Sequence, residues 1–272
     1  MDKYSVLMSL YIKEKPEYLR LAVQSMVDQT ISPDEIIIVK DGSVTPELLA
    51  VLDEFTEKYP ALFSIVGYEQ NKGLGYALNY GIERSKNELI ARMDTDDISK
   101  PERCEKQLEM FAKNPELAIV GSNVDEFCFD PKNVVSVRAV PTEHKDIYEF
   151  AKRRSAFNHP AVMYKKSAVL SVGGYSDLRR NQDVELFGRM LFSGCKAANI
   201  GEPLLWFRSD DALAKRRKSW ENTKSYINTI KKFRKMGYSD FGDLAAVAIA
   251  QTGMFLCPAK LQHWIYKKFL RG

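Results

Sequence analysis

The chain has 272 residues, of which 45% are hydrophobic and 28% are charged, with a formal net charge of +4. A chain of this length and composition can bury its own core, which excludes collagen-like, low-complexity and wholly disordered proteins. Its four cysteines are far apart and form no C-x-x-C pair, so we expect reduced thiols rather than a zinc ribbon or a disulfide framework. The sequence predicts no signal peptide, and its longest apolar stretch, 244–257, is shorter than the roughly 20 residues of a spanning helix.

Charge divides the chain near residue 210. Residues 212–272 carry 13 Lys and Arg and 3 Asp and Glu, a net charge of +10. Residues 1–211 carry 27 Lys and Arg and 33 Asp and Glu, a net charge of −6. We therefore predict two parts, 1–210 and a basic extension 211–272, and expect the extension to contact an anionic partner.

Predicted strands and helices alternate over the first hundred residues. Apolar runs predict strands at 4–10, 35–39, 63–68 and 89–93, and apolar residues at helical spacing predict helices at 16–27, 46–59 and 73–84. Residues 35–39 read EIIIV, which is typical of a strand buried on both faces in a parallel sheet. The alternation predicts a doubly wound α/β fold, in which ligands bind beyond the carboxyl ends of the strands. Residues 9–11, 40–43 and 94–97 are then expected to line one crevice.

The pattern is less regular after residue 97. Helices are predicted at 101–113, 146–154 and 183–192, and strands at 118–129 and 161–164. Residues 130–145 contain two prolines and are expected to be mostly loop. The basic extension 211–272 is expected to be mainly helical.

Three carboxylates follow the fourth predicted strand in Arg92–Asp97, RMDTDD. Like charges this close repel one another unless a cation compensates, and carboxylate oxygens suit hard divalent cations. Asp94 and Asp96 are spaced so that a turning backbone can direct both toward one point. The alternative is a turn whose aspartates cap the helix after Pro101, but the position at the end of an apolar strand favours the metal site.

Four further positions each have a structural and a functional interpretation. Asp41 follows the EIIIV strand, where it serves either an Asp-Gly turn or a ligand N–H. Lys72 lies in Asn71–Gly75 at a helix start, where backbone N–H groups favour anions, although the segment fits neither a Walker A loop nor a dinucleotide fingerprint. Asp183 begins a helix, which suits either a favourable helix-dipole contact or a general base. His159 has no nucleophile nearby in sequence and is expected to line the site or to be structural.

Eight segments, in this order, resemble family-2 glycosyltransferases with the GT-A fold over about residues 4–210. They are S-L-Y (9–11), D-Q-T (28–30), P-D-E-I-I-I-V-K-D-G-S (33–43), N-K-G-L-G-Y-A-L-N-Y-G (71–81), A-R-M-D-T-D-D (91–97), N-H-P-A-V-M (158–163), V-G-G-Y (172–175) and Q-D-V-E-L (182–186). They most resemble bacterial enzymes that build capsule, exopolysaccharide or O-antigen, including amylovoran-type galactosyltransferases. The resemblance implies a Rossmann-like, doubly wound mixed sheet with helices on both faces. It also implies inverting transfer of a sugar from a UDP-sugar to an acceptor hydroxyl, and the subgroup suggests galactose.

The same resemblance implies residues that bind the nucleotide. Ser9 and Tyr11 would flank the base, with Tyr11 stacking on it, and Asp41 would accept the uracil N–H. Lys72 would approach the diphosphate. Lys40 stands where many relatives carry an aspartate.

The resemblance implies a metal centre and a catalytic base as well. Asp94 would hold the ribose or share the metal, and Asp96 would be the principal ligand of Mn²⁺ or Mg²⁺. Asp183 would be the base that takes the acceptor proton, although the preceding Gln182 replaces an acidic residue of many relatives. The Q-x-x-R-W motif of processive synthases is absent, which favours a single addition.

Cations cluster in the extension at 215–218, 231–235 and 263–271, and Trp, Tyr and Phe are interleaved with Lys and Arg in the later runs. This pattern suits helices at a membrane interface, where a lipid-diphosphate-linked acceptor would be met on the inner face of the bacterial membrane. The alternative is a solvated basic face whose aromatic residues pack onto the body. No nucleic-acid-binding module accompanies the charge, so nucleic acid is not expected as a partner. Arg216 or Arg217 is a further hypothetical contact for the donor diphosphate.

Two other functions compete with this interpretation. A sugar-phosphate nucleotidyltransferase should carry a G-x-G-x-R signature after the first strand, and this signature is missing. A non-catalytic member of an assembly complex would bind a nucleotide without turnover. The sequence thus favours a metal-dependent hexosyltransferase in the cytoplasm, peripheral to the membrane, that uses a nucleotide sugar and a glycan or lipid-diphosphate-linked acceptor.

Overall fold

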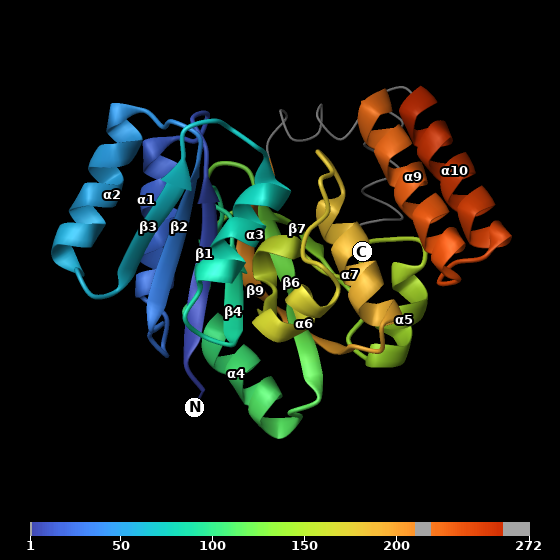
Figure 1. The fold of residues 1–272 in the computed structure, drawn as a ribbon, viewed down its shortest axis with the longest axis horizontal. Helices are drawn as coiled ribbons and strands as arrows, with labels where there is room; N and C mark the ends of the chain where they lie inside the picture. The colour runs from blue at the N-terminus through green and yellow to red at the C-terminus, as the bar shows by residue number, and fades with distance from the viewer. Residues whose placement is uncertain (1, 210–218, 258–272) are drawn as a thin grey trace.

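The computed structural model describes residues 2–209 and 219–257, and within them one mixed sheet runs through the molecule (Figure 1). Its strands are β1 (Tyr4–Leu10), β2 (Glu35–Asp41), β3 (Phe63–Tyr68), β4 (Leu89–Met93), β5 (Ile98–Ser99), β6 (Leu117–Phe127), β7 (Val134–Arg138), β8 (Met163–Lys165) and β9 (Lys196–Arg208). The strand order is β3-β2-β1-β4-β8-β6-β9-β5, and β7 pairs with β6 outside this order. The helices are α1 (Pro16–Val27), α2 (Pro46–Lys58), α3 (Leu74–Arg84), α4 (Arg103–Lys113), α5 (His144–Ala151), α6 (Lys166–Ser171), α7 (Gln182–Phe192), α9 (Trp220–Met236) and α10 (Phe241–Leu256), with a 3₁₀ turn, η1 (His159–Ala161).

The first half of the sheet is parallel, as predicted. β3, β2, β1 and β4 pair in parallel, and helices cover both faces. Successive side chains of a strand point to opposite faces, so Leu7 and Ile37 pack with α3 and α7, whereas Met8 and Ile38 pack with α1, α2 and α4. The apolar runs at 4–10 and 35–39 therefore contribute side chains to two hydrophobic cores, one on each face of the sheet. This is why polar and apolar residues do not alternate in them.

The second half of the sheet differs from the prediction. β8 is antiparallel to β4 and β6, and β6 is parallel to β9. The expected loop 130–145 contains the strand β7 and the start of α5. β7 pairs only with β6 and leaves Val134 and Val135 exposed, so its sequence lacks the pattern of a buried strand. β9 had no predicted counterpart, since Gly201 and Pro203 interrupt its sequence and its pairing with β6 shifts register.

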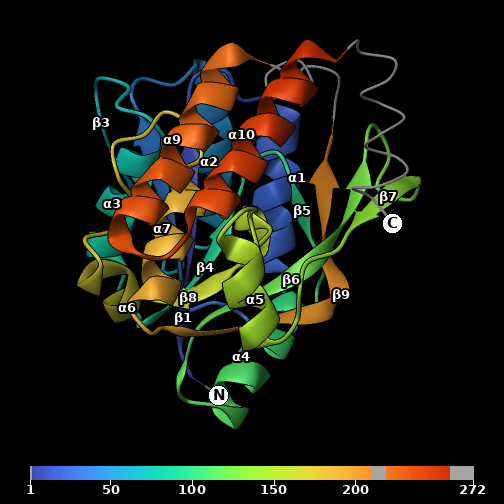
Figure 2. The same cartoon turned by 90° about the vertical axis from the view of Figure 1, so that its right-hand side faces the viewer.

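Helices α9 and α10 lie side by side over α7 and α5 (Figure 2). Phe233 of α9 is fully buried against Gly188 of α7, and the Tyr238 hydroxyl donates to the Tyr148 carbonyl at 2.8 Å. In the segment 231–235 the aromatic residue thus packs onto the body while the cations remain outside. The expected basic segments 215–218, with Arg216 and Arg217, and 263–271 lie outside the described residues. Within the described ranges, no helix is long and apolar enough to span a membrane.

Gly188 permits α7 and α9 to approach each other, which gives a stability prediction. A Cβ at this position would lie inside the van der Waals radius of the buried Phe233 ring. We expect Gly188→Ala to destabilise the protein by about 1–3 kcal/mol through overpacking, measured as a lower Tm. Gly253→Ala on α10 is the matched control, because nothing lies within 4 Å of its Cβ and alanine favours a helix. A Gly188→Ala protein as stable as the wild type would contradict this account.

Candidate active site

Three strand ends meet at one edge of the parallel sheet, as expected. Ser9 pairs in register with Val39, and Met8 pairs with Met93. The residues that follow each strand, including Tyr11 and Asp94, therefore lie next to one another at the carboxyl edge. In parallel sheets this edge is where ligands bind.

Asp41 is buried and surrounded by donors. Its carboxylate accepts hydrogen bonds from the Tyr68 hydroxyl (2.8 Å), the Asn71 side chain (2.8 Å) and the backbone N–H groups of Lys72 (2.7 Å) and Gly73 (3.0 Å). Burial, followed by the Asp41 carboxylate, raises the pKa of Tyr68. Asp41 therefore fixes the turn before α3. The side chain of Lys72, in the same turn, packs against Tyr76, with its ammonium 4.4 Å from the centre of the ring.

The three carboxylates that follow β4 lie together. One ligand oxygen from each of Asp94, Asp96 and Asp97 falls within 4.8 Å of the others. Arg208, at the end of β9, holds this segment: its backbone N–H donates to Asp97 Oδ1 at 2.7 Å, and its Nε donates to the Asp96 carbonyl at 2.8 Å. The buried Arg92 side chain forms an ion pair with Asp94. The expected convergence of Asp94 and Asp96 is thus present, and Asp97 joins them.

The electrostatics of this cluster fit a divalent cation. Burial, and then the charges of Asp94 and Glu14, raise the pKa of Asp96 to about 7. Burial, and then Asp96, raise the pKa of Asp97 well above its ordinary value, and among the described residues Asp97 Oδ2 has no hydrogen-bond partner. Because oxygen donors and excess negative charge are what a hard cation requires, the three carboxylates suit Mn²⁺ or Mg²⁺.

A buried polar network lies beside the acidic cluster. Arg92 is 1% exposed, and its Nε and Nη1 have no hydrogen-bond partner within the described part of the chain. His159 Nε2 lies 2.8 Å from the Tyr175 hydroxyl. Burial, and then the Arg92 charge, lower the pKa of His159 well below its ordinary value, so the imidazole is neutral at pH 7. His159 is therefore a neutral residue of the site.

Asp183 stands in the first turn of α7, next to an unusual backbone. Asn181, the N-cap, has φ +59°, the only positive φ of a non-glycine residue in the described ranges, and its side chain makes no capping hydrogen bond. Burial raises the pKa of Asp183, and backbone N–H groups, Arg92 and Arg138 oppose this shift. Strained backbone is frequent at functional sites, where the surrounding structure maintains it.

One cavity is lined both by Asp94 of the acidic cluster and by Asp183. It has a volume of about 690 Å³, and its lining includes Asp94, His159 and Asp183. The other predicted site residues, Ser9, Tyr11, Asp41, Lys72 and Asp96, are not part of this lining. The cavity therefore lies between the strand ends and α7, beside the positions predicted for the nucleotide.

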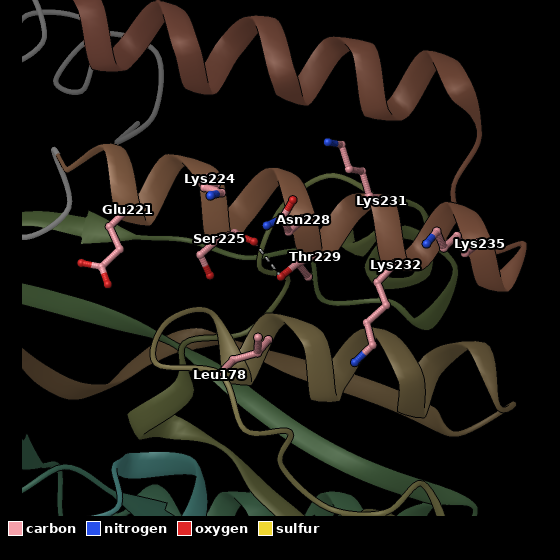
Figure 3. Close-up of a pocket in the computed structure, with 9 residues that line it drawn as sticks. All are labelled: Leu178, Glu221, Lys224, Ser225, Asn228, Thr229, Lys231, Lys232 and Lys235. Atoms are coloured by element: carbon pink, nitrogen blue, oxygen red, sulfur yellow. Dashed lines mark hydrogen bonds between the residues drawn. The ribbon is translucent and has the colours of Figure 1, made fainter.

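A second cavity, of about 580 Å³, lies along α9 (Figure 3). It is lined by Leu178 and by α9 residues that include Lys224, Lys231, Lys232 and Lys235. Lys232 points toward α7 and forms an ion pair with Glu185. This cavity is basic and holds none of the predicted site residues.

Several residues of the site were not predicted from the sequence. Arg92 had a signal, since it is a charged residue in an otherwise apolar strand, LIARM. Arg208 had none, because it lies 111 residues from the Asp97 side chain that it contacts. Tyr175 belongs to the V-G-G-Y segment (172–175), to which the sequence assigned no role in the site.

Comparisons with known proteins identify relatives across nearly the whole chain. The profile of the family "Glycosyl transferase family 2" matches residues 5–178. Three bacterial relatives align over 269 residues, 99% of this chain. An uncharacterized glycosyltransferase of Haemophilus influenzae is 38% identical (99% of its length). The UDP-Gal:alpha-D-GlcNAc-diphosphoundecaprenol beta-1,3-galactosyltransferase of Escherichia coli is 37% identical (97%). The amylovoran biosynthesis glycosyltransferase AmsE of Erwinia amylovora is 35% identical (100%).

Solved structures share the fold at low sequence identity. The mannosyltransferase PcManGT from Pyrobaculum calidifontis, in complex with GDP-Man and Mn²⁺, superposes with a TM-score of 0.65 at 12% identity, covering 98% of this chain and 79% of that one. S. aureus TarS 1–349 in complex with UDP superposes with a TM-score of 0.64 at 12% identity, covering 97% and 78%. The mixed sheet with helices on both faces is thus the expected GT-A fold. The chain belongs to glycosyltransferase family 2.

Proposed function

We propose that this protein is a metal-dependent, inverting hexosyltransferase that moves galactose from UDP-galactose to an acceptor hydroxyl during assembly of a bacterial surface polysaccharide. The observation that carries the proposal is the single cavity lined by both Asp94 and Asp183, in a chain of glycosyltransferase family 2. The donor and the pathway are supported by two relatives, the galactosyltransferase of Escherichia coli and the amylovoran enzyme of Erwinia amylovora.

Asp183 is the proposed catalytic base. In the transfer step its carboxylate takes the acceptor hydroxyl proton as the acceptor oxygen bonds to the anomeric carbon. The bond from that carbon to the donor diphosphate breaks, and its electron pair leaves with the diphosphate. Attack from the face opposite the leaving group inverts the anomeric centre. The raised pKa of Asp183 makes it a stronger base than an exposed aspartate.

The acidic cluster and the strand ends are proposed to hold the donor. Asp94 and Asp96 would ligate Mn²⁺ or Mg²⁺, with Asp94 alternatively contacting the ribose. A divalent cation bound there would stabilise the negative charge that develops on the departing diphosphate. The convergence of these carboxylates and the raised pKa of Asp96 support this role.

The remaining predicted residues are proposed to bind the nucleotide. Ser9 and Tyr11 flank the uracil, and Tyr11 stacks on it. Asp41 accepts the uracil imide N–H in place of one of its present donors, and Lys72 contacts the diphosphate. The adjacent strand ends support this arrangement.

The extension 211–272 is proposed to lie against the inner face of the cell membrane, with the protein otherwise in the cytoplasm. Lys231, Arg234 and Lys235 of α9 are exposed and would face anionic lipid. The acceptor is then a glycan or a lipid-linked sugar, as the name of the Escherichia coli relative indicates for that enzyme.

A donor screen tests the proposed function. Purified protein with Mn²⁺ is incubated with UDP-galactose, UDP-glucose, UDP-N-acetylglucosamine and GDP-mannose, and the release of free nucleotide is measured. We expect turnover of UDP-galactose above that of the other donors. Binding of UDP without release from any donor would instead support a non-catalytic member of an assembly complex.

A further inference from the structure

The 690 Å³ cavity combines three chemically different surfaces. Its acidic end is formed by Asp94, Glu126 and Asp183. Its second surface is basic and is formed by Arg138, Arg153 and Arg154. Its third surface is the apolar side of α10, formed by Ala246, Val247, Ala250, Met254 and Phe255.

The basic surface lies next to the proposed catalytic base. Both Arg138 and Asp183 line the cavity, and the Arg138 charge is among the groups that oppose the rise that burial causes in the pKa of Asp183. The Arg154 guanidinium lies 5.0 Å from the centre of the Phe150 ring, and Arg153 forms an ion pair with Asp243. Within residues 2–209 and 219–257, no ion pair or side-chain hydrogen bond occupies the guanidinium of Arg138. Planar guanidinium groups match phosphate oxygens with paired hydrogen bonds.

The apolar surface continues from the cavity to the outside of the molecule. Ala246 and Ala250 line the cavity and are also exposed, and Ile249 is 75% and Leu256 72% exposed on the same helix. After Asp243, α10 carries no charged residue. An aliphatic chain that enters along α10 would therefore contact apolar side chains from the molecular surface to the arginines.

We propose that Arg138, Arg153, Arg154 and the apolar side of α10 form the acceptor subsite, and that they bind the diphosphate and the first aliphatic segment of a lipid-diphosphate-linked sugar. The three surfaces correspond to the three kinds of group in such a molecule, and Arg153 connects the basic residues to α10 through its ion pair with Asp243. Its sugar hydroxyl reaches Asp183, its two phosphates meet the three arginines, and its chain follows α10. A neutral free glycan has no anionic group for the arginines and no aliphatic chain for the apolar side of α10. This inference rests on the proposed function, because it assigns the sugar end to Asp183.

Binding of decyl diphosphate to the full chain tests the subsite without a sugar. Titrations are performed in EDTA, so that no metal-bound diphosphate contributes, and inorganic diphosphate and decanol serve as the two partial probes. We expect decyl diphosphate to bind at least tenfold more tightly than either partial probe. Equal affinity for decyl diphosphate and inorganic diphosphate would overturn the apolar half of the subsite, and equal affinity for decyl diphosphate and decanol would overturn its basic half.

Variants locate the binding site. We expect Arg138→Gln combined with Arg154→Gln to weaken decyl diphosphate binding at least tenfold, whereas Arg20→Gln, in an exposed pair with Glu54, does not. We expect Ala250→Glu to weaken it similarly, and Leu21→Glu, an exposed apolar position of α1, to leave it unchanged. Thermal unfolding shows that each variant folds. Tight binding that neither the arginine nor the Ala250 variant weakens would overturn the assignment.

The transferase function and the acceptor subsite can be disproved independently of each other. Wild-type protein that releases UDP from UDP-galactose but does not prefer decyl diphosphate keeps the proposed function and loses the acceptor subsite. Wild-type protein that prefers decyl diphosphate but turns over no donor loses the transferase function instead.

Discussion

Asp183→Asn is expected to lower kcat by about 10²–10⁴ with little change in the KM for the donor. Asparagine keeps the shape of the side chain but cannot take a proton, and this range is typical of the loss of a positioned general base. The experiment measures initial rates of nucleotide release with saturating donor, and of transfer once an acceptor is known. Asp146→Asn, an exposed acidic residue in the first turn of α5, is the matched control and should keep wild-type rates.

The pH dependence of the rate is a second test of Asp183 as the catalytic base. Burial raises the pKa of Asp183, and the base acts only when it is ionised. The rate should therefore fall as pH falls through this raised pKa, above the ordinary aspartate range near 4. In Asp183→Asn this acidic limb should disappear together with the activity. More than a tenth of wild-type kcat in the variant would show that another group takes the proton.

The parallel half of the sheet was predictable because three of its strands, β1, β2 and β4, are buried on both faces. A run such as Ile36, Ile37 and Ile38 contributes to two cores at once, so it lacks polar residues and is distinct in the sequence. β7 and β9 were not predictable in the same way. β7 is a pairing edge with exposed valines, and β9 contains Gly201 and Pro203 and is only partly buried. Their strand character comes from pairing with β6, a tertiary effect that no local pattern records.

The carboxylates of the acidic cluster were predictable from the sequence, but the residues that hold them in place were not. Asp94 and Asp96 are close in sequence, so their convergence follows from local geometry at a strand end. Arg208 approaches them only after β9 has crossed the sheet, and the pKa of His159 is lowered by its burial in the folded protein and then by the charge of Arg92. Asp41 was expected either to serve its own Asp-Gly turn or to contact a ligand N–H, whereas its carboxylate accepts hydrogen bonds from a distant turn at Asn71 and Lys72.

Asp96→Asn is expected to have opposite effects on activity and on stability. With one proposed ligand lost, Mn²⁺-dependent turnover should fall at least about 100-fold, because several kcal/mol of charge stabilisation depend on the cation. Chelation of the metal from the wild type should have a similar effect. In EDTA at pH 8, however, the variant should be more stable than the wild type, because it no longer holds a half-buried carboxylate beside two others.

The sign of the stability change follows from the raised pKa. Asp96 titrates near 7 in the folded protein, whereas an unfolded aspartate titrates near 4, so the folded state binds this proton more tightly. Its contribution to stability is fully present below about pH 4 and is lost as pH rises through about 7. Asparagine cannot ionise, so the advantage of the variant in Tm should be largest at pH 8 and should shrink toward pH 5. The difference between the folded and unfolded pKa of Asp96 corresponds to a few kcal/mol of stability at pH 8. Each kcal/mol shifts the Tm of a protein of this size by roughly 2–4 °C.

Bound Mn²⁺ is expected to reduce the stability advantage of the variant over the wild type. A cation that binds only the folded state raises wild-type stability by about 2.7 kcal/mol at 100 times its Kd, and Asp96→Asn should lose most of this gain. Asp125→Asn is the control, because Asp125 is also buried but pairs with Lys100 at 2.7 Å. That variant should lower Tm at pH 8 and keep the Mn²⁺ effect. If Asp96→Asn also lowers Tm in EDTA at pH 8, the carboxylate is stabilised by the protein itself and has no need of a cation.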